Sequence, residues 1–291
     1  MTLASNCRTT TFLLSWGEYG PAAGEFEQPN GITITGDEQV FVADGNNNRI
    51  QVFGADGSFL RQWGSRGVAD GQFNGPSDLA TSETDVWVTD HLNHRVQKFS
   101  HEGAFERSWG TNGRAPGEFA FPTGIARGSD SRIYVSDTGN SRIQVFSGDG
   151  VFIREWGPTG SGNAALDAPR GIAVDATSGD VLVVDVNNQR VVRFTGEGVF
   201  RSELAGIFKG PRHVAVNSAG LVYVSDANDK RVQVFDTAGT PLHAWGTIRP
   251  DDSIPSVPEG VGVGPSGHVY VVDAAVSKIK KYSTINKARA F

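Results

Sequence analysis

Short apolar runs that end in an aspartate recur along the whole chain. The first reads Val-Phe-Val-Ala-Asp at residues 40–44. Similar runs lie at residues 86–90, 133–137, 181–185, 222–226 and 269–273. Their aspartates follow one another at steps of 46, 47, 48, 41 and 47 residues. A nearly constant period of this length indicates one supersecondary unit that is used repeatedly.

Three further strand patterns accompany each apolar run. A basic residue stands five positions after each aspartate and opens a second strand, such as Arg-Ile-Gln-Val-Phe at 49–53. A glycine turn then leads into a strand that ends in Trp-Gly, as at 57–64, and a proline leads the next strand. These prolines are Pro29, Pro76, Pro122, Pro169, Pro211 and Pro258. Four short strands separated by Gly, Asn and Asp turns predict one antiparallel sheet per repeat.

The number of repeats and the two ends of the chain predict how these sheets assemble. Six sheets arranged radially hide most of their edges, so we expect an all-β, six-bladed β-propeller of four-stranded antiparallel blades. The sixth repeat has no Trp-Gly strand after Tyr282, whereas residues 12–17 form such a strand with no preceding partner. Trp16 precedes Pro29 by 13 residues, the spacing found in four later repeats. The N-terminal strand is therefore expected to close the last blade.

These boundaries give a single propeller domain at 12–283, with a disordered lead at 1–11 and a C-terminal tail at 284–291. The chain has 26 lysines and arginines against 32 acidic residues, a net charge of −6, which argues against capture of nucleic acid by bulk charge. It has one cysteine, Cys7, which excludes an intramolecular disulfide and fits a reducing compartment. No apolar run approaches about 18 residues, so no membrane span is predicted. We expect a cytoplasmic monomer, and leave open a signal peptide removed earlier.

One segment, Asn93-His94-Arg95-Val96-Gln97, makes the repeat recognisable. Together with the preceding apolar-x-Val-x-Asp run, it resembles the core of the NHL repeat. The resemblance extends from about Phe12 to Tyr282. The resemblance implies a propeller fold. It gives little information about function, because propellers of this kind bind RNA, bind proteins or catalyse reactions.

Residue types that occur in every repeat are most simply architectural. The six aspartates and the bases that follow them are expected to form equivalent salt-bridged or hydrogen-bonded turns. The tryptophans are expected to pack between blades instead of forming a ligand cage. The bases are Arg49, Arg95, Arg142, Arg190, Arg231 and Lys278, and the tryptophans are Trp16, Trp63, Trp109, Trp156 and Trp245.

Function is better sought where the repeats differ on one face. Because strand direction alternates, the proline ends of the inner strands, the Asp-to-Arg turns and the loops after Trp-Gly all meet at one end of the propeller. The two residues after each proline are expected to lie nearest the mouth of the central channel. Candidate ligand-binding residues at this mouth are Asn30, Asp78, Arg170, Arg212, His213 and Glu259, with His91 added from an Asp-to-Arg turn.

Loop lengths point to the same sector. The fourth repeat has lost its tryptophan, and only seven residues lead from Leu204 to Pro211. This deletion is expected to lower the rim beside Arg170 and Arg212. Arginine side chains suit a carboxylate or a phosphate, which favours a polar pocket with a cationic wall. An alternative hypothesis is equally open: these side chains line a water-filled channel and pair with the nearby acidic residues.

Two function classes remain after the chemistry is considered. The first is a binding scaffold that recognises a peptide or protein segment, or a small anionic ligand, at the channel mouth. The alternative is a lyase or hydrolase at the same mouth, metal-free or calcium-dependent, in which His213 and Glu259 would be catalytic. Asp78 could take the place of Glu259 as the acidic partner. No metal ligand set and no cofactor are predicted, since only His213 among the histidines stands in the inner ring, but channel carbonyls leave calcium open. Single-stranded RNA is the weaker option, because the mouth lacks an evident stacking aromatic.

Overall fold

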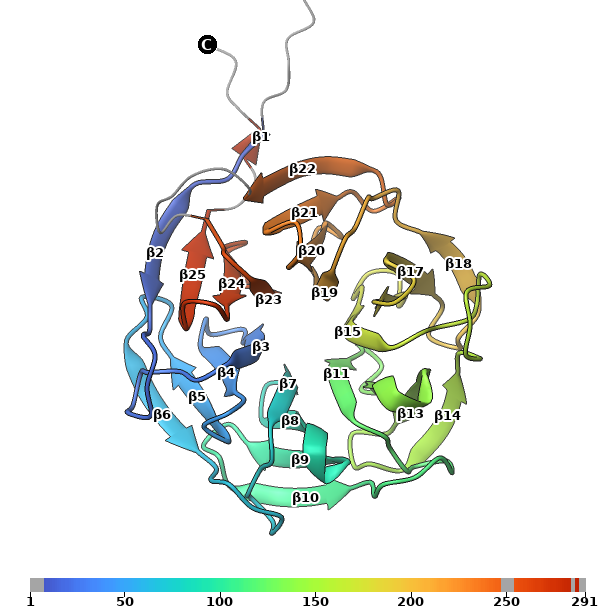
Figure 1. Cartoon of the computed structure of the whole chain (residues 1–291), viewed down its shortest axis with the longest axis horizontal. Coiled ribbons are helices and arrows are strands. Elements are labelled where there is room, and N and C mark those ends of the chain that lie inside the picture. Colours follow the sequence, from blue (N-terminus) through green and yellow to red (C-terminus); the bar gives the residue numbers. More distant parts are fainter. Residues whose placement is uncertain (1–7, 247–253, 284–285, 288–291) are drawn as a thin grey trace, which may run out of the picture.

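A computed structural model describes residues 8–246, 254–283 and 286–287 of the chain. It contains six four-stranded antiparallel sheets arranged in a ring around a central channel (Figure 1). The all-β, six-bladed propeller predicted from the repeats is thereby confirmed. Cys7 lies outside the described residues.

Blades 1 to 5 follow the chain, and each runs from the channel outward. Blade 1 is β3 (Pro29–Ile34), β4 (Val40–Asp44), β5 (Arg49–Phe53) and β6 (Phe59–Trp63). Blade 2 is β7 (Pro76–Thr81), β8 (Asp85–Asp90), β9 (Arg95–Ser100) and β10 (Phe105–Trp109), with the short 3-10 helix η1 (His91–Asn93) in its Asp-to-Arg turn. Blade 3 is β11 (Pro122–Arg127), β12 (Ile133–Asp137), β13 (Arg142–Phe146) and β14 (Phe152–Trp156), with η2 (Thr138–Asn140).

The remaining blades complete the circle. Blade 4 is β15 (Pro169–Val174), β16 (Val181–Asp185), β17 (Arg190–Phe194) and β18 (Phe200–Glu203). Blade 5 is β19 (Pro211–Val216), β20 (Val222–Asp226), β21 (Arg231–Phe235) and β22 (Pro241–Gly246). Blade 6 joins both ends of the chain: β23 (Pro258–Val263), β24 (Val269–Asp273), β25 (Lys278–Tyr282) and β2 (Phe12–Trp16).

The N-terminal strand closes the ring, as the two chain ends predict. β2 pairs with β25 in an antiparallel register that places Phe12 opposite Tyr282 and Trp16 opposite Ile279. Two further short strands, β1 (Arg8–Thr9) and β26 (Asn286–Lys287), also pair with each other. They lie in the segments expected to be a disordered lead and a tail, outside the domain limits drawn at 12–283.

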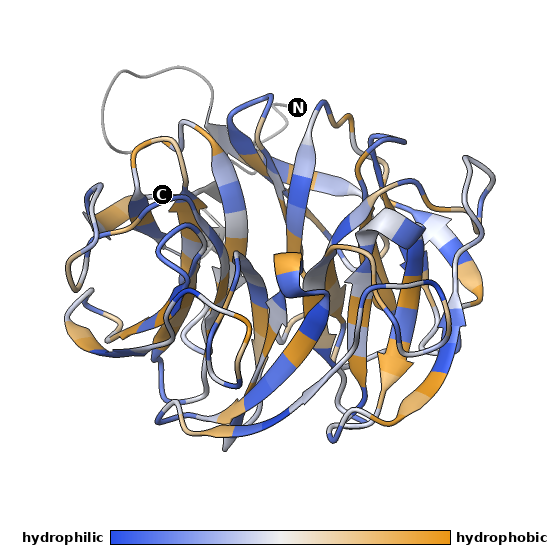
Figure 2. Cartoon of the chain, turned by 60° about the horizontal axis from the view of Figure 1, so that its bottom comes forward, coloured by the Kyte–Doolittle hydropathy of each residue, from blue (hydrophilic) through white to orange (hydrophobic). Residues whose placement is uncertain are grey.

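The core lies between neighbouring blades. One cluster joins Ile143 and Val145 of blade 3 to Val181 and Val183 of blade 4, and five similar clusters occupy the other gaps. Both faces of each blade are thus covered, which explains why the second strands read as nearly unbroken apolar runs. Figure 2 shows hydrophobic segments along the strands, while many of the connecting turns are hydrophilic.

The tryptophans pack at these interfaces, as expected from their recurrence. Trp109 at the end of blade 2 contacts Phe146 of blade 3, with ring centroids 5.9 Å apart. Gly150, in the outer turn of blade 3, lies against the same indole with a positive φ of 81°. In blade 4, Leu204 takes the place of the tryptophan and lies against Gly239 of blade 5.

Substitution of Gly150 by alanine is expected to lower the free energy of unfolding by about 2 kcal/mol, because the residue has a left-handed conformation and its surroundings are full. A Cβ at this position would lie 2.5 Å from the Trp109 ring. Gly36→Ala is the matched control, since nothing lies within 4 Å of a Cβ there. Urea denaturation of both variants measures the difference, and equal losses would contradict this packing role.

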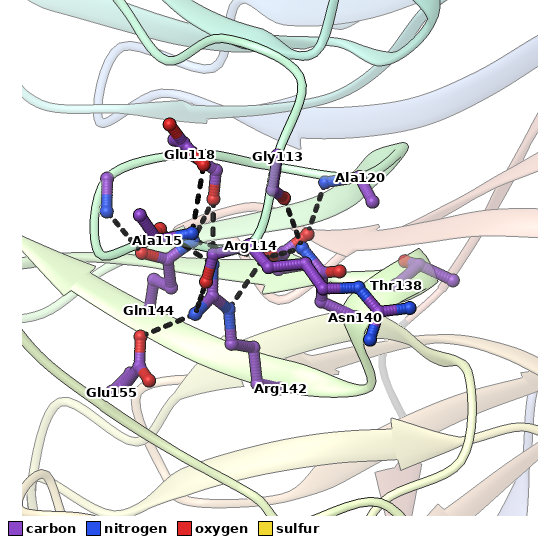
Figure 3. A network of polar contacts seen from close by, with 12 residues as sticks. Gly113, Arg114, Ala115, Glu118, Ala120, Thr138, Asn140, Arg142, Gln144 and Glu155 are labelled. Carbon is purple, nitrogen blue, oxygen red and sulfur yellow. Dashed lines mark hydrogen bonds and ion pairs between the residues drawn. The ribbon is translucent and has the colours of Figure 1, made fainter.

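The aspartate and arginine of each Asp-to-Arg turn hold the blade and the preceding loop together. In blade 3, Asp137 accepts hydrogen bonds from the amide of Ala120 and from Asn140, Arg142 and Gln144, at 2.7–3.0 Å (Figure 3). Arg142 also donates to the carbonyls of Arg114, Ala115 and Glu118 and to the Glu155 carboxylate. The guanidinium is therefore fully used inside the framework.

The pairing between aspartate and base holds in blades 1 to 4, where the Nε–Oδ2 distances are 2.7–2.8 Å. Blades 5 and 6 depart from the expected equivalence. In blade 5 the shortened loop leaves few carbonyls within reach, and Arg231 instead contacts the Ile207 carbonyl and Asp229. In blade 6 it is Lys280, at the position of Gln144, that pairs with Asp273 at 3.0 Å.

Candidate functional site

A bulge at the start of every inner strand shapes the channel mouth. In all six blades the register between the first two strands shifts just after the proline. Bulges of this kind bend a strand and redirect its side chains. The residues after each proline consequently gather around the channel, where they line a common cavity.

The third position of each inner strand is crowded, and four of the six blades place glycine there. These glycines are Gly31, Gly124, Gly171 and Gly260. A Cβ on Gly171, for example, would lie 2.5 Å from the Cα of His213. The other two blades carry Asp78 and His213 at this position. The two strands that hold them, β7 and β19, lie on opposite sides of the ring (Figure 1).

Asp78 and His213 form a bridge across the channel. His213 Nε2 lies 3.1 Å from Asp78 Oδ2, and the same oxygen accepts the amide of Ile125 at 3.1 Å. The Thr89 hydroxyl of β8 accepts a hydrogen bond from the amide of Asp78 and so holds β7 in place. His213 Nδ1 and Asp78 Oδ1 are buried and have no hydrogen-bond partner within the described part of the chain.

The bridge changes the titration of the histidine. Burial alone would lower the pKa of His213, but the charge of Asp78 and the hydrogen bond between them outweigh this cost, so the pKa is raised above 6.5. The protonated form is therefore favoured in the folded protein. Above the pKa the bridge loses its ionic component.

Two arginines beside the bridge share one carboxylate. Arg170 Nη2 and Arg212 Nε each lie 3.6 Å from an oxygen of Glu259. Both distances are longer than the 2.7–2.8 Å of the framework pairs. Burial lowers the pKa of Arg170, and the negative charge of Glu259 offsets part of this decrease. Since Asp78 is already paired with His213, this group of three side chains carries one uncompensated positive charge.

Two cavities that share lining residues lie at this face. The inner one, lined by Asn30, Asp78, Arg170, Arg212, His213 and Glu259 among others, measures about 20 Å³. This is room for one or two waters or one small group. Above it, a vestibule of about 380 Å³ is lined by Asn30, His91, Leu92, Thr123 and Arg170 among others. Arg170 and Asn30 line both cavities.

His91 lies on the vestibule wall, and its pKa is shifted in the opposite direction from that of His213. Its Nδ1 lies 3.1 Å from the carbonyl oxygen of Pro122. Burial lowers the pKa of His91, and the positive charge of Arg170 lowers it further. The hydrogen bond to the Pro122 carbonyl raises the pKa, but by less than these effects lower it. The ring is therefore neutral at pH 7.

An aromatic residue that the sequence analysis did not identify lies next to His91. Phe121 contacts the rings of His91 and His94 at centroid distances of 5.5 and 4.6 Å, and 45% of its surface is exposed. Leu92 on the vestibule wall is 47% exposed. Phe121 is thus an exposed aromatic side chain beside His91, although it lines neither of the two cavities. A comparison of the residues before each proline could have found Phe121, since other repeats have Gln28, Gly75 and Ala168 there.

The structure brings the predicted site residues together and selects one of the pairings that the sequence leaves open. His213 pairs with Asp78, while Glu259 contacts the arginines. Six of the seven candidates line the inner cavity, and His91 lines the vestibule. Across the described ranges, no cluster of three or more His, Cys, Asp or Glu side chains is arranged to hold a metal. None of the helices placed in those ranges could cross a membrane.

The closed ring, the polar mouth and the axial channel define a six-bladed propeller with a candidate ligand site at one end. Five segments match the NHL repeat, at residues 26–53, 73–99, 119–146, 166–194 and 208–235. The chain is thus a member of the NHL-repeat β-propeller family, as the sequence resemblance indicates.

Comparison with individual proteins supports the same family and fold. A stretch of 65 residues is 38% identical to the protein brain tumor of Drosophila melanogaster, covering 22% of this chain and 6% of that protein. A streptogramin B lyase structure matches with a TM-score of 0.66 at 18% identity, covering 95% of this chain and 98% of that one. A chain of a nidogen/laminin complex matches with a TM-score of 0.65 at 18% identity, covering 82% and 86%. At these identities the two structures show the fold alone.

Proposed function

We propose that this propeller is a binding scaffold that takes a carboxylate-bearing segment of another protein at the channel mouth. The observation that carries the proposal is that Arg170 and Arg212 share the single carboxylate of Glu259 at 3.6 Å. In the framework, the same residue types form close pairs. The guanidinium donors at the mouth therefore have capacity for a further acceptor.

The physical argument rests on how arginine binds carboxylates. A charge-assisted N–H···O bond is typically about 2.7–2.9 Å long and stronger than a neutral one. A carboxylate that entered between the two guanidiniums would gain such bonds and compensate the residual positive charge. The inner cavity of about 20 Å³ limits what enters to a small group, while the vestibule of about 380 Å³ has room for the residue that carries it.

The known relatives are consistent with a protein partner. One solved structure with this fold comes from a complex of nidogen with laminin. Because the stretch aligned with the protein brain tumor is 6% of that protein, the rest of its activity carries no weight here. A free small anion offers the same carboxylate or phosphate chemistry and is tested as a competitor.

The experiment is a binding titration by fluorescence polarisation with labelled acidic peptides selected on the wild-type protein. The double variant Arg170→Ala with Arg212→Ala is expected to bind about 100-fold more weakly, since each charge-assisted hydrogen bond contributes about 1.5–3 kcal/mol. Arg107→Ala, on the exposed outer strand β10, should bind as the wild type does. Unchanged affinity in the double variant would refute the proposal, and displacement of the peptide by acetate or phosphate at micromolar concentration would favour a small free anion.

A catalytic function is the second candidate, favoured by the Asp78–His213 pair. A histidine oriented by a carboxylate is the usual arrangement of a general base, and its Nδ1 has no partner among the described residues. A lyase or hydrolase at this mouth would lose turnover when His213 is replaced by alanine. Screening the wild type and His213→Ala against ester, lactone and peptide substrates tests this, and absence of any turnover in the wild type counts against catalysis.

A further inference from the structure

We infer that the carboxylate recognised at the mouth is the C-terminus of a partner chain, and that its last side chain is apolar and packs on a wall formed by His91, Leu92 and Phe121. This inference rests on the proposed function and gives the chemistry of its ligand. We refer to the three residues as the apolar wall.

The sizes of the two cavities favour a chain end. The inner cavity has room for one small group, and it shares Arg170 as a lining residue with the vestibule. A chain that passed through the site would have to bring its backbone down to the arginines and back through the same opening. A terminal residue has its carboxylate and its side chain on one Cα, so the carboxylate can reach Arg170 while the side chain remains in the vestibule.

Leu92 occupies a position where the other repeats have small or polar residues. Leu92 corresponds to Asn46, Gly139, Asn187 and Asn228 in the Asp-to-Arg turns of blades 1, 3, 4 and 5. Leu92 and Phe121 are both close to half exposed, in contrast to the apolar residues that build the blades. Covering such surface removes apolar area from water and therefore favours binding.

The neutral ring of His91 is suited to contact with an apolar side chain of the ligand. Its pKa is lowered by burial, and its Nδ1 is engaged with the Pro122 carbonyl. The ring therefore presents a neutral aromatic surface next to Phe121, 5.5 Å between centroids. Cationic and apolar surfaces thus lie side by side at one opening, which matches an α-carboxylate next to an aliphatic or aromatic side chain.

The test uses four fluorescein-labelled hexapeptides, again read by polarisation. The first three have the same five non-acidic residues before the last one, and the fourth differs from the second only by an aspartate at its fifth position. The first ends in phenylalanine with a free carboxylate, the second is its C-terminal amide, and the third ends in serine with a free carboxylate. The fourth ends in an Asp-Phe amide, so that its only added carboxylate is on a side chain. The free-acid phenylalanine peptide is expected to bind at least 10-fold more tightly than any of the other three.

Leu92→Asn is the matched variant, because asparagine stands at this position in blade 1. It should reduce the preference for phenylalanine over serine to less than threefold and leave the affinity of the serine peptide unchanged. Ile207→Asn, another exposed apolar residue in a loop of the same face, serves as control and should change neither peptide.

The failures of the two proposals are distinguishable. Tight binding of the Asp-Phe amide would assign the carboxylate to a side chain and overturn the inference. An unaltered phenylalanine preference in Leu92→Asn, with binding still dependent on Arg170 and Arg212, would overturn the apolar wall alone. Binding of all four peptides that is indifferent to both arginines would refute the proposed function itself.

Discussion

Replacing Arg142 with alanine is expected to lower the free energy of unfolding by about 3–5 kcal/mol, the usual cost of removing one partner from a buried ion pair. The change leaves the Asp137 carboxylate buried without its cation. It also removes the hydrogen bonds that the guanidinium donates to the carbonyls of Arg114, Ala115 and Glu118 in the loop between blades 2 and 3. Guanidinium chloride denaturation followed by tryptophan fluorescence measures the loss.

The control is the equivalent substitution in blade 5. Arg231 makes one hydrogen bond to the Ile207 carbonyl and an ion pair to Asp229, and its Nε has no partner in the described structure. Arg231→Ala is therefore expected to cost only about 1 kcal/mol. Similar losses in Arg142→Ala and Arg231→Ala would show that the network in Figure 3 does not stabilise the blade as described.

The second large effect is expected at the bridge across the channel. Asp78→Ala should lower the free energy of unfolding by about 3 kcal/mol, because it leaves His213 buried and the Ile125 amide without an acceptor. Asp78→Asn, which retains side-chain oxygen but removes the charge, should lose less. Both variants are measured at pH 5.5, where His213 is protonated in the folded protein.

The pH dependence provides an independent check. Since the folded-state pKa of His213 is raised above 6.5, the stabilisation from its charge is fully present below pH 6.5. It is then lost as the pH rises through the folded-state pKa. Asp78→Asn should abolish this decline. A wild-type stability that does not fall above pH 6.5, or falls equally in Asp78→Asn, would mean that the bridge is not ionic.

The fold was accessible from the sequence because each level of the repeat carries its own signal. Proline begins each inner strand, aspartate ends the second, and glycine marks the outer turns. The extra Trp-Gly strand at one end and the missing one at the other fixed the closure and the number of blades. Local signals of this kind need no knowledge of distant contacts.

The members of the site were accessible as well, but the sequence left several pairings among them open. Asp78 and His213 are 135 residues apart, and only the opposite placement of blades 2 and 5 in a ring of six brings them together. The departures in blades 5 and 6 depend on how many loop carbonyls reach the base, as at Arg231, which residue types alone do not determine. Leu92 and Phe121 have apolar side chains and lie outside the positions directly after each proline, so a comparison of polar residues at the mouth does not identify them.

The arginines of the framework and those of the mouth differ in how many of their hydrogen-bond donors are engaged. Arg142 has all its donors engaged within the blade, whereas Arg170 and Arg212 share one distant carboxylate. A protein that needed these two side chains only for stability would be expected to pair them as closely as the framework does. This difference supports the proposal that they bind an anionic group.

A crystal structure of the protein with the free-acid phenylalanine peptide tests this claim most directly. The account predicts a terminal carboxylate between the two guanidiniums, with N–O distances of about 2.7–2.9 Å to both. A peptide bound elsewhere on the propeller, with Arg170 and Arg212 still 3.6 Å from Glu259, would contradict it.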